Sequence, residues 1–462
     1  MGNQDIVQKL WGLCNVLRDD GITYHQYVNE LAYLLFLKMA REIEAEEHIP
    51  SGYRWIDLFK VPVSEQFDFY RRQLVVLGTS NNETIRTIFA NPTSLLRHPE
   101  SLSTLVAKID EIDWYSIGRE GLGDIYEGLL EKNASEKKSG AGQYFTPRPL
   151  IEAIVEVIRP EAKDVIHDPA AGTGGFLVVA NEYIKIRSKQ SVANPFFVGV
   201  ELVQDTHRLL LMNAILHGMA GEFLHEDSLS ASGAARIPPA DIILTNPPFG
   251  NKRGGGLPGR RDLAYPTSNK QLAFLQHIIL SLKPGGRAAV VVPDSVLYEG
   301  NIGKSIRREL IDTCNLHTIL RLPDGIFYAN VTTCVLFFVK DARGTQNVWL
   351  YDMRANLPNF GKRTPLGREH FAEFEAAYGS APDGSSDRND QGESGRFRRF
   401  SRSYIEQRNF DLAMTWLIED KHGNSDAVAD IDEIANQIRE VLHAAFDDFE
   451  QLVEQLQTEP QK

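Results

Sequence analysis

A glycine-containing loop follows a short strand-like segment near the middle of the chain. The loop reads Asp-Pro-Ala-Ala-Gly-Thr-Gly-Gly-Phe at residues 168–176, directly after segment 164–167 and before an apolar helical pattern. Glycines in this position let the backbone approach a ligand closely at the carboxyl end of a parallel strand. The dinucleotide pattern G-x-G-x-x-G fails because Leu177 stands at its third glycine, and the pattern G-x-x-x-x-G-K-[ST] is absent from the chain. The loop therefore predicts a ligand-binding turn that is neither a dinucleotide fingerprint nor an ATPase P-loop.

Two further acidic residues stand where later strands are expected to end. Glu201 closes the segment 196–201, and Asp227 follows an expected third strand at 222–226. A carboxylate at such a strand end can accept both hydroxyl groups of a ribose. Together with Asp168, these acids favour a nucleoside pocket over three unrelated solvated side chains. The pocket suits a cationic ligand better than a pyrophosphate, because Asp168 would repel phosphate.

A proline-rich turn follows the next expected strand. It reads Asn-Pro-Pro-Phe at residues 246–249, directly after segment 241–245. Two prolines fix φ, remove two backbone donors and leave carbonyl groups free to point outward. An amide, a carbonyl and an aromatic face can together hold a planar amino group. The alternative is a plain turn after a buried strand. This alternative is less favoured because the motif follows the glycine loop and the two acids at successive strand ends.

The segments around these motifs alternate between strand and helix patterns. After the polar linker 131–142, we expect helices at 151–158, from residue 176, at 206–217 and at 271–282. The expected strands are 164–167, 196–200, 222–226, 241–244, 288–292 and 333–339. This alternation predicts an α/β fold with a doubly wound, mainly parallel sheet.

Helical patterns flank the α/β region on both sides. The first 135 residues carry apolar positions at helical spacing, such as Ile6, Leu10, Leu13 and Leu17, and are expected to form a scaffold without chemistry of its own. Segment 381–395 is poor in apolar residues and predicts a disordered loop or a domain edge. The expected domains are a helical domain at 1–135, a catalytic domain at 140–415 and an amphipathic helix at 424–460.

The charge and cysteine content restrict the class of protein. The chain has 462 residues and a net charge of −13, but the segment from Asn424 onward carries −8 of this, so an anionic partner for the remainder is not excluded. The three cysteines are far apart and predict neither a disulfide framework nor a metal site, which suits a reducing cytoplasm. No apolar stretch approaches the ~20 residues of a membrane helix, and the first residues do not resemble a secretory signal.

The combined motifs resemble those of S-adenosylmethionine-dependent amino-methyltransferases. The Asn-Pro-Pro-Phe turn alone is shared with protein-glutamine and ribosomal-RNA guanine methyltransferases. Two further motifs, Leu-Gly-Asp-Ile-Tyr-Glu at 122–127 and Gly-Gln-Tyr-Phe-Thr-Pro at 142–147, narrow the resemblance to one group. Over nearly the whole chain, the sequence is similar to the modification (M) subunit of type I DNA restriction-modification systems, an adenine-N6 methyltransferase family.

The resemblance implies a role for each motif. Asp168 and the loop backbone would contact the methionine end of S-adenosylmethionine, Glu201 its ribose and Asp227 the amino group of its adenine. The motif at 143–146 would close over the methionine side. The implied cofactor-binding residues are Gln143, Tyr144, Phe145, Thr146, Asp168, Ala170, Gly172, Thr173, Gly174, Glu201 and Asp227. The implied catalytic residues, which receive the target base, are Asn246, Pro247, Pro248 and Phe249, and no metal is expected.

The chemistry of an adenine amino group agrees with these roles. Its nitrogen is a poor nucleophile because the lone pair is delocalised into the ring. If the Asn246 side-chain oxygen and the Pro247 carbonyl accept its two N–H groups, the nitrogen becomes more tetrahedral and its lone pair points at the sulfonium methyl. Positioning and fixed dipoles then supply the catalysis without a strong general base. The base must be flipped out of the duplex, where Phe249 can stack on it.

Two basic stretches suggest contact with DNA phosphates. We expect both to flank the catalytic turn; they comprise Lys252, Arg253, Arg260, Arg261 and Lys270, then Arg396, Arg398, Arg399 and Arg402. Nothing resembles a helix-turn-helix or a zinc module, so sequence recognition is expected from a separate specificity (S) subunit. The expected partners are thus double-stranded DNA and the S subunit, and the resemblance also admits a second M subunit and a restriction (R) subunit. The alternatives are methylation of another amino nitrogen, in protein glutamine or RNA guanine, or a catalytically silent scaffold.

Overall fold

The computed structural model describes most of the α/β region and the N-terminal helices. Its described residues are 3–19, 21–22, 24–92, 94–114, 125–126, 128–129, 146–187, 195–252, 256–327, 331–354, 360 and 364–417. Gln143, Tyr144, Phe145, Arg253 and the expected C-terminal helix lie outside them. Within these ranges, none of the helices has the length and apolar character that a membrane span requires.

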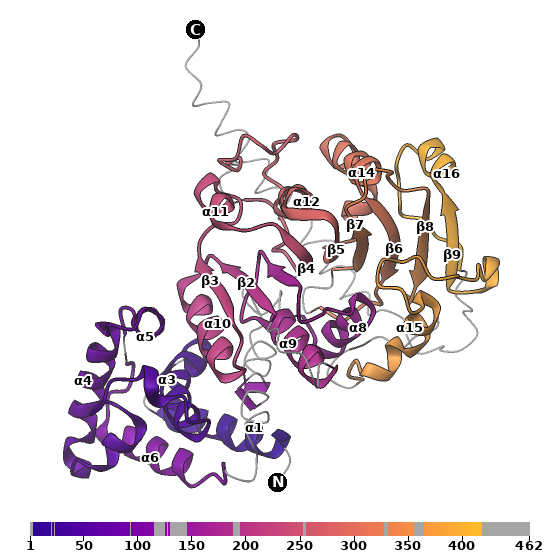
Figure 1. The fold of residues 1–462 in the computed structure, drawn as a ribbon. Helices are drawn as coiled ribbons and strands as arrows, with labels where there is room; N and C mark the ends of the chain where they lie inside the picture. Colours follow the sequence, from indigo (N-terminus) through magenta and orange to yellow (C-terminus); the bar gives the residue numbers. More distant parts are fainter. Residues whose placement is uncertain are drawn as a thin grey trace, which may run out of the picture. The chain divides into compact units, whose positions relative to one another are not determined.

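The strands that precede the sequence motifs all belong to one sheet. In the described part of the chain it has nine strands in the order β3-β2-β1-β4-β5-β7-β6-β8-β9 (Figure 1). They are β1 (Val165–Asp168), β2 (Phe196–Glu201), β3 (Gly221–His225), β4 (Ala240–Thr245), β5 (Leu282–Pro293), β6 (Asn315–Arg321), β7 (Thr333–Val339), β8 (Asn347–Asp352) and β9 (Phe397–Ser401).

The strand directions place the motifs at one edge of the sheet. Strands β3, β2, β1, β4 and β5 are parallel, β7 is antiparallel to β5 and β6, and β9 is antiparallel to β8. The chain adds β2 and β3 on one side of β1 and then crosses to β4 on the other. Open α/β sheets bind ligands at the carboxyl ends of the strands where the order reverses in this way. The expected doubly wound, mainly parallel sheet is therefore confirmed.

Helices cover both faces of the sheet, as Figure 1 shows. On one face lie α8 (Arg148–Ile158), α9 (Gly175–Arg187) and α15 (Ala372–Tyr378). On the other lie α12 (Lys270–Ser281), α14 (Ile302–Thr313) and α16 (Arg402–Gln407). Strand β4 shows why two cores form: Ile242 and Leu244 enter the first core and Ile243 the second, because successive side chains of a strand point to opposite faces. The remaining helices between strands include α10 (Gln204–Leu216), α11 (Ala231–Arg236) and α13 (Ser295–Tyr298).

The N-terminal helices share a hydrophobic core of their own. They are α1 (Asn3–Gly12), α2 (Cys14–Asp19), α3 (Tyr24–Glu42), α4 (Gln66–Gly78), α5 (Glu83–Ile88) and α6 (Pro99–Asp110). Helix α10 contributes Leu209 and Met212 to this core. Its buried Arg208 donates from Nε to the Ile88 carbonyl at 2.6 Å and from Nη2 to the Ala90 carbonyl at 3.0 Å. Helix α10 is therefore shared between the helical region and the sheet region.

Segment 381–395 is a defined loop packed on β6, so the expectation of a disordered loop was wrong. Gly384 has φ +75°, and a Cβ atom there would lie 2.3 Å from Nδ1 of His317. Arg388 donates to the hydroxyl of Thr318 at 2.8 Å and to the carbonyl of Tyr378 at 3.0 Å. A glycine in the left-handed region and one half-buried arginine thus order a segment that has few apolar side chains.

Candidate active site

Asp168 is the last residue of β1 and is almost completely buried, with 1% of its surface exposed. Its Oδ1 atom accepts hydrogen bonds from the Thr245 hydroxyl at 2.6 Å and from the Ala170 amide at 3.0 Å. Burial raises the pKa of Asp168 to about 7, although both hydrogen bonds oppose the shift and the charge of Glu201 adds to it. The carboxylate is therefore poised to ionise near neutral pH.

The loop after Asp168 requires its glycines. Gly172 has φ +56° and Gly174 φ +92°, both in the left-handed region. A Cβ atom at Gly174 would lie 2.7 Å from Cδ1 of Leu210 on α10, so this glycine permits close packing. A Cβ atom at Gly172 would meet nothing within 4 Å. The loop therefore packs tightly at Gly174 and borders open space at Gly172.

Glu201 at the end of β2 is attached directly to this loop. Its Oε2 accepts from the Gly172 amide at 3.0 Å, and its Oε1 accepts from the Val203 amide at 2.7 Å. Burial raises the pKa of Glu201, against these backbone hydrogen bonds. The two bonds fix the carboxylate beside the open space at Gly172.

Asp227 lies two residues beyond β3, in a turn that also reaches the glycine loop. Its Oδ1 accepts from the Leu229 amide at 2.9 Å. The neighbouring Ser228 hydroxyl donates to the carbonyl of Pro169 at 2.6 Å. The structure thus gathers the three strand-end acids of β1, β2 and β3 around one loop, as the sequence predicted.

Asn246 directly follows Thr245, the residue that binds Asp168. Only 8% of Asn246 is exposed, and its Nδ2 donates to the hydroxyl of Thr146 at 2.9 Å. Thr146, in the described part of the Gly-Gln-Tyr-Phe-Thr-Pro motif, therefore contacts the Asn-Pro-Pro-Phe turn, whereas the resemblance implies a place over the cofactor. No pattern in the sequence pointed to this contact, which joins residues 100 positions apart.

The rest of the turn is held on α12. Pro247 is buried, and Pro248 and Phe249 are half-buried. The Gly250 amide donates to Oε1 of Gln271 at 2.9 Å, and the Lys270 amide donates to the Gly250 carbonyl at 2.9 Å. The position of the turn is thus set by β4 on one side and by the start of α12 on the other.

Arg260 is not a surface cation, contrary to the expectation that it contacts phosphate. Its side chain is buried, with Nε donating to Asp262 Oδ1 at 2.9 Å and Nη1 to the Ser228 carbonyl at 3.3 Å. Nη1 also contacts Nδ1 of His277, whose pKa is lowered by burial and by nearby cationic groups. Arg260 therefore links the turns after β3 and β4, and no sequence signal separated it from the exposed Lys252 and Arg261.

The second basic stretch does not flank the site. Strand β9, which carries Arg398 and Arg399, is five strand positions from β4, or roughly 24 Å at 4.8 Å per strand. Arg398 lies over the ring of Trp416 at 5.6 Å, and Arg402 pairs with Asp312 and Glu406. These arginines lie at the far edge of the sheet, because β9 is the last strand in the sheet order. The two basic stretches are therefore not neighbours.

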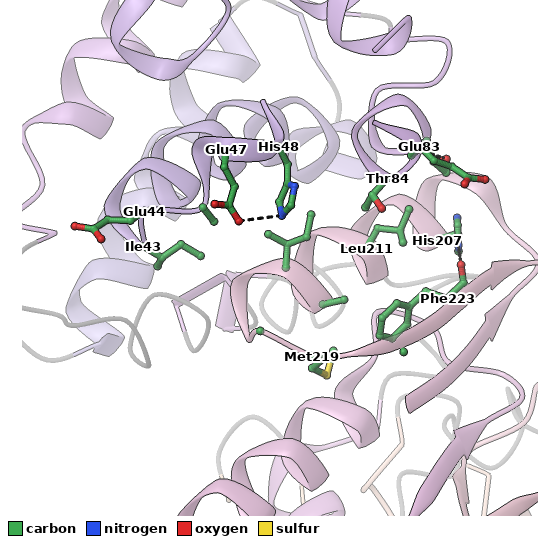
Figure 2. Close-up of a pocket in the computed structure, with 16 residues that line it drawn as sticks. Ile43, Glu44, Glu47, His48, Glu83, Thr84, His207, Leu211, Met219 and Phe223 are labelled. Atoms are coloured by element: carbon green, nitrogen blue, oxygen red, sulfur yellow. Dashed lines mark hydrogen bonds and ion pairs between the residues drawn. The ribbon is translucent and has the colours of Figure 1, made fainter. Parts of the chain in front are cut away.

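A cavity of about 650 Å³ lies elsewhere, between the end of α3, α5, α10 and the start of β3 (Figure 2). Its wall carries Glu44, Glu47 and Glu83, and Glu47 pairs with His48 at 3.5 Å. Gly221, at the amino end of β3, also lines it, whereas the motif residues lie at the carboxyl ends of the strands. This cavity is therefore separate from the candidate active site. Among the described residues, no group of three or more His, Cys, Asp or Glu side chains is arranged to hold a metal ion.

Two family models and several curated proteins match this chain over most of its length. The N-6 DNA Methylase family model matches residues 118–425, and the HsdM N-terminal domain model matches residues 6–109. The type I restriction enzyme EcoKI methylase subunit of Escherichia coli K12 is 43% identical, covering 99% of this chain and 96% of the relative. The StySPI methylase subunit of Salmonella potsdam is 44% identical over the same shares of the two chains.

Solved structures of such subunits have the same fold. The crystal structure of the EcoKI M protein matches with a TM-score of 0.57 at 39% identity, covering 98% of this chain and 97% of that one. A chain from a structure of type I restriction-modification complex assembly matches with a TM-score of 0.70 at 28% identity over 100% of both chains. The chain therefore belongs to the N-6 DNA methylase family, among the methylase subunits of type I restriction enzymes.

Proposed function

We propose that the chain transfers a methyl group from S-adenosylmethionine to N6 of adenine in double-stranded DNA, with the sequence read by a specificity subunit. The observation that carries this proposal is the Thr245–Asp168 hydrogen bond of 2.6 Å. It places the acid of the ligand loop beside the residue that precedes Asn246. A cofactor held by Asp168 and an amino group held by Asn246 would therefore lie next to each other. The full-length match to type I methylase subunits supports DNA as the substrate.

The residues at the carboxyl ends of β1 and β2 fit this cofactor. The open space at Gly172 leaves room for a ligand against the loop backbone. Each Glu201 oxygen accepts one backbone N–H and retains capacity for a ribose hydroxyl. Asp168 would attract the cationic methionine end, and Asp227 would face the adenine amino group. When bound, the cofactor supplies an electrophilic methyl group on a positively charged sulfur.

Asn246 and its neighbours would prepare the target nitrogen. The contact of Nδ2 with Thr146 turns the amide oxygen of Asn246 away from Thr146. That oxygen and the Pro247 carbonyl would accept the two N–H groups of the flipped adenine, while Phe249 stacks on the base. Rigid acceptors of this kind accelerate a reaction because they need no reorganisation as it proceeds.

The central test is methylation in a host that lacks adenine methylation. Long-read sequencing should detect N6-methyladenine at a defined DNA sequence when the chain is expressed together with its specificity subunit, and none when either is omitted. Asn246→Ala should lower the methylation rate by about 10²–10³ and leave cofactor affinity unchanged, because the residue faces the base. Absence of N6-methyladenine from the complete complex, or a wild-type rate for Asn246→Ala, contradicts the proposal.

Thr146 should act as a positioning residue for Asn246. Thr146→Val removes the hydroxyl that accepts from Nδ2 and lets the amide rotate. We expect kcat to fall about 10- to 100-fold with little change in KM for the cofactor, and Thr146→Ser to restore most of the rate. Steady-state kinetics on the assembled complex measure both quantities. A rise in KM for the cofactor at unchanged kcat would place Thr146 at the cofactor instead.

Cofactor affinity should depend on the ionisation of Asp168. Its pKa is about 7 in the free protein, and a cationic ligand favours the carboxylate, so binding should lower this pKa. Affinity should then fall as pH drops below 7, by at most about tenfold per pH unit, and binding there should release protons. Calorimetry in buffers of different ionisation enthalpy measures this release, and Asp168→Asn should abolish it. Wild-type affinity that is constant between about pH 5.5 and pH 8 would rule out the role.

The acidic tail is proposed to join the chain to the specificity subunit. Its apolar stripe from Ile431 to Leu456 lies outside the described residues, and the spacing indicates an amphipathic helix that needs a protein surface. Its acids would repel DNA phosphates. Truncation after Gly423 should therefore preserve cofactor binding but abolish both co-purification with the specificity subunit and site-specific methylation. A truncated chain that still assembles and methylates would exclude this role.

A further inference from the structure

The connection between β5 and α14, residues 294–301, and the first residue of α14 expose two large apolar side chains. Tyr298, at the end of α13, is 56% exposed, and Ile302, at the start of α14, is 41% exposed. Single exposed apolar residues are common on protein surfaces. Tyr298 and Ile302 differ from such residues in two ways. The connection that presents them is held rigidly, and it lies near the carboxyl edge of the sheet.

The connection is fixed by buried polar groups. Arg307 is 2% exposed, and its Nη1 donates to the carbonyls of Val296 at 2.9 Å and Glu299 at 2.7 Å. The backbone of Asn301 has φ +46° and ψ −114°, a combination that costs free energy for a residue other than glycine. Strained backbone persists only where the surroundings impose it, and it clusters at functional sites.

The same connection is tied to the segment that follows the Asn-Pro-Pro-Phe turn. Nδ2 of Asn269 donates to Oε2 of Glu299 at 3.3 Å, and the backbone of Asn269 forms a β-bridge with Asn251. Thr245 of β4 pairs with Val290 of β5. Strand β5 then continues for three residues to Pro293, roughly 10 Å at 3.3 Å per residue. The connection therefore begins beyond the level of Asn246, which directly follows the neighbouring strand β4.

A duplex that delivers a flipped base to Asn246 must lie against this projecting edge. The flipped nucleotide remains joined to its strand, so its neighbours stay within one nucleotide of the pocket. The segment between β4 and α12 carries the exposed cations Lys252 and Arg261, and the Lys252 amide donates to the carbonyl of Ser268, next to Asn269. Cations of this kind suit DNA phosphates, and aromatic rings combined with cations bind unstacked nucleic acid.

We propose that Tyr298 contacts the DNA next to the flipped adenine and stacks in the space that the base leaves, with Ile302 packing beside it. This inference rests on the proposed function, since it needs a flipped base in DNA. The rigid connection presents the ring without a loss of loop entropy on binding. Tyr298 thus favours the flipped state of the substrate rather than taking part in methyl transfer.

The test uses the complex of this chain with its specificity subunit and a duplex that carries 2-aminopurine at the methylated position found by sequencing. Tyr298→Ala should reduce the 2-aminopurine fluorescence increase and lower the methylation rate about tenfold, with unchanged cofactor affinity and assembly. Tyr298→Phe should keep wild-type behaviour, because the ring does the stacking. Tyr404→Ala is the matched control, as Tyr404 is 42% exposed and lies on α16 beside the far strand β9.

Three outcomes would overturn the inference. Wild-type fluorescence and rate for Tyr298→Ala would show that the ring does not contact the flipped state. Loss of the specificity subunit from the Tyr298→Ala complex would show that this surface binds protein instead. An equal loss in Tyr404→Ala would show a general effect of removing an exposed aromatic ring. A wild-type complex that methylates no DNA would contradict the proposed function itself, which the wild-type measurement separates from the effect of the variant.

Discussion

The hydrogen bond from the Thr245 hydroxyl to Asp168 Oδ1 joins the two halves of the site. Its length is 2.6 Å, and both residues are buried at the point where the strand order reverses between β1 and β4. The glycine loop begins on one side of this bond and the Asn-Pro-Pro-Phe turn on the other. Any shift of β4 along β1 would separate Asp168, the acid proposed to face the cofactor, from Asn246, the amide proposed to face the base. The parallel pairing Ile166–Ile242 and His167–Ile243 holds that register.

Burial gives the site its electrostatic character. Asp168 and Glu201 both have raised pKa values, and loss of solvation is the main cause for each. Buried carboxyl groups of this kind discriminate strongly by the charge of a ligand, because the surroundings screen charge poorly. A cation is attracted and a phosphate is repelled. This agrees with a reaction in which a cationic group gives up a methyl group, and with catalysis by positioning rather than by a strong base.

Local patterns predicted the strands and motifs that form the centre of the site. Each motif follows an apolar segment of β1, β2 or β4, so its place at the carboxyl edge follows from the parallel sheet alone. Strands β6, β8 and β9 were not predicted, although they complete the sheet. The Thr146–Asn246 contact and the burial of Arg260 were also not predicted, because both depend on tertiary pairing between distant segments. Charge spacing could not show that Arg398 and Arg399 lie roughly 24 Å from β4.

Few of the cations near the Asn-Pro-Pro-Phe turn are available for contact with DNA. In the described part of the segment between β4 and α12, Lys252 and Arg261 are exposed, while Arg260 is engaged with Asp262 and Ser228. Phosphate contacts supply most of non-specific DNA affinity, and the segment from residue 424 onward, which carries −8 of the net charge of −13, offers no attraction for DNA. Two exposed cations supply only a weak attraction for phosphates. On the proposed function, the subunit would therefore depend on a partner for affinity as well as for sequence recognition, and its own surface at the carboxyl edge would act once the duplex has been delivered.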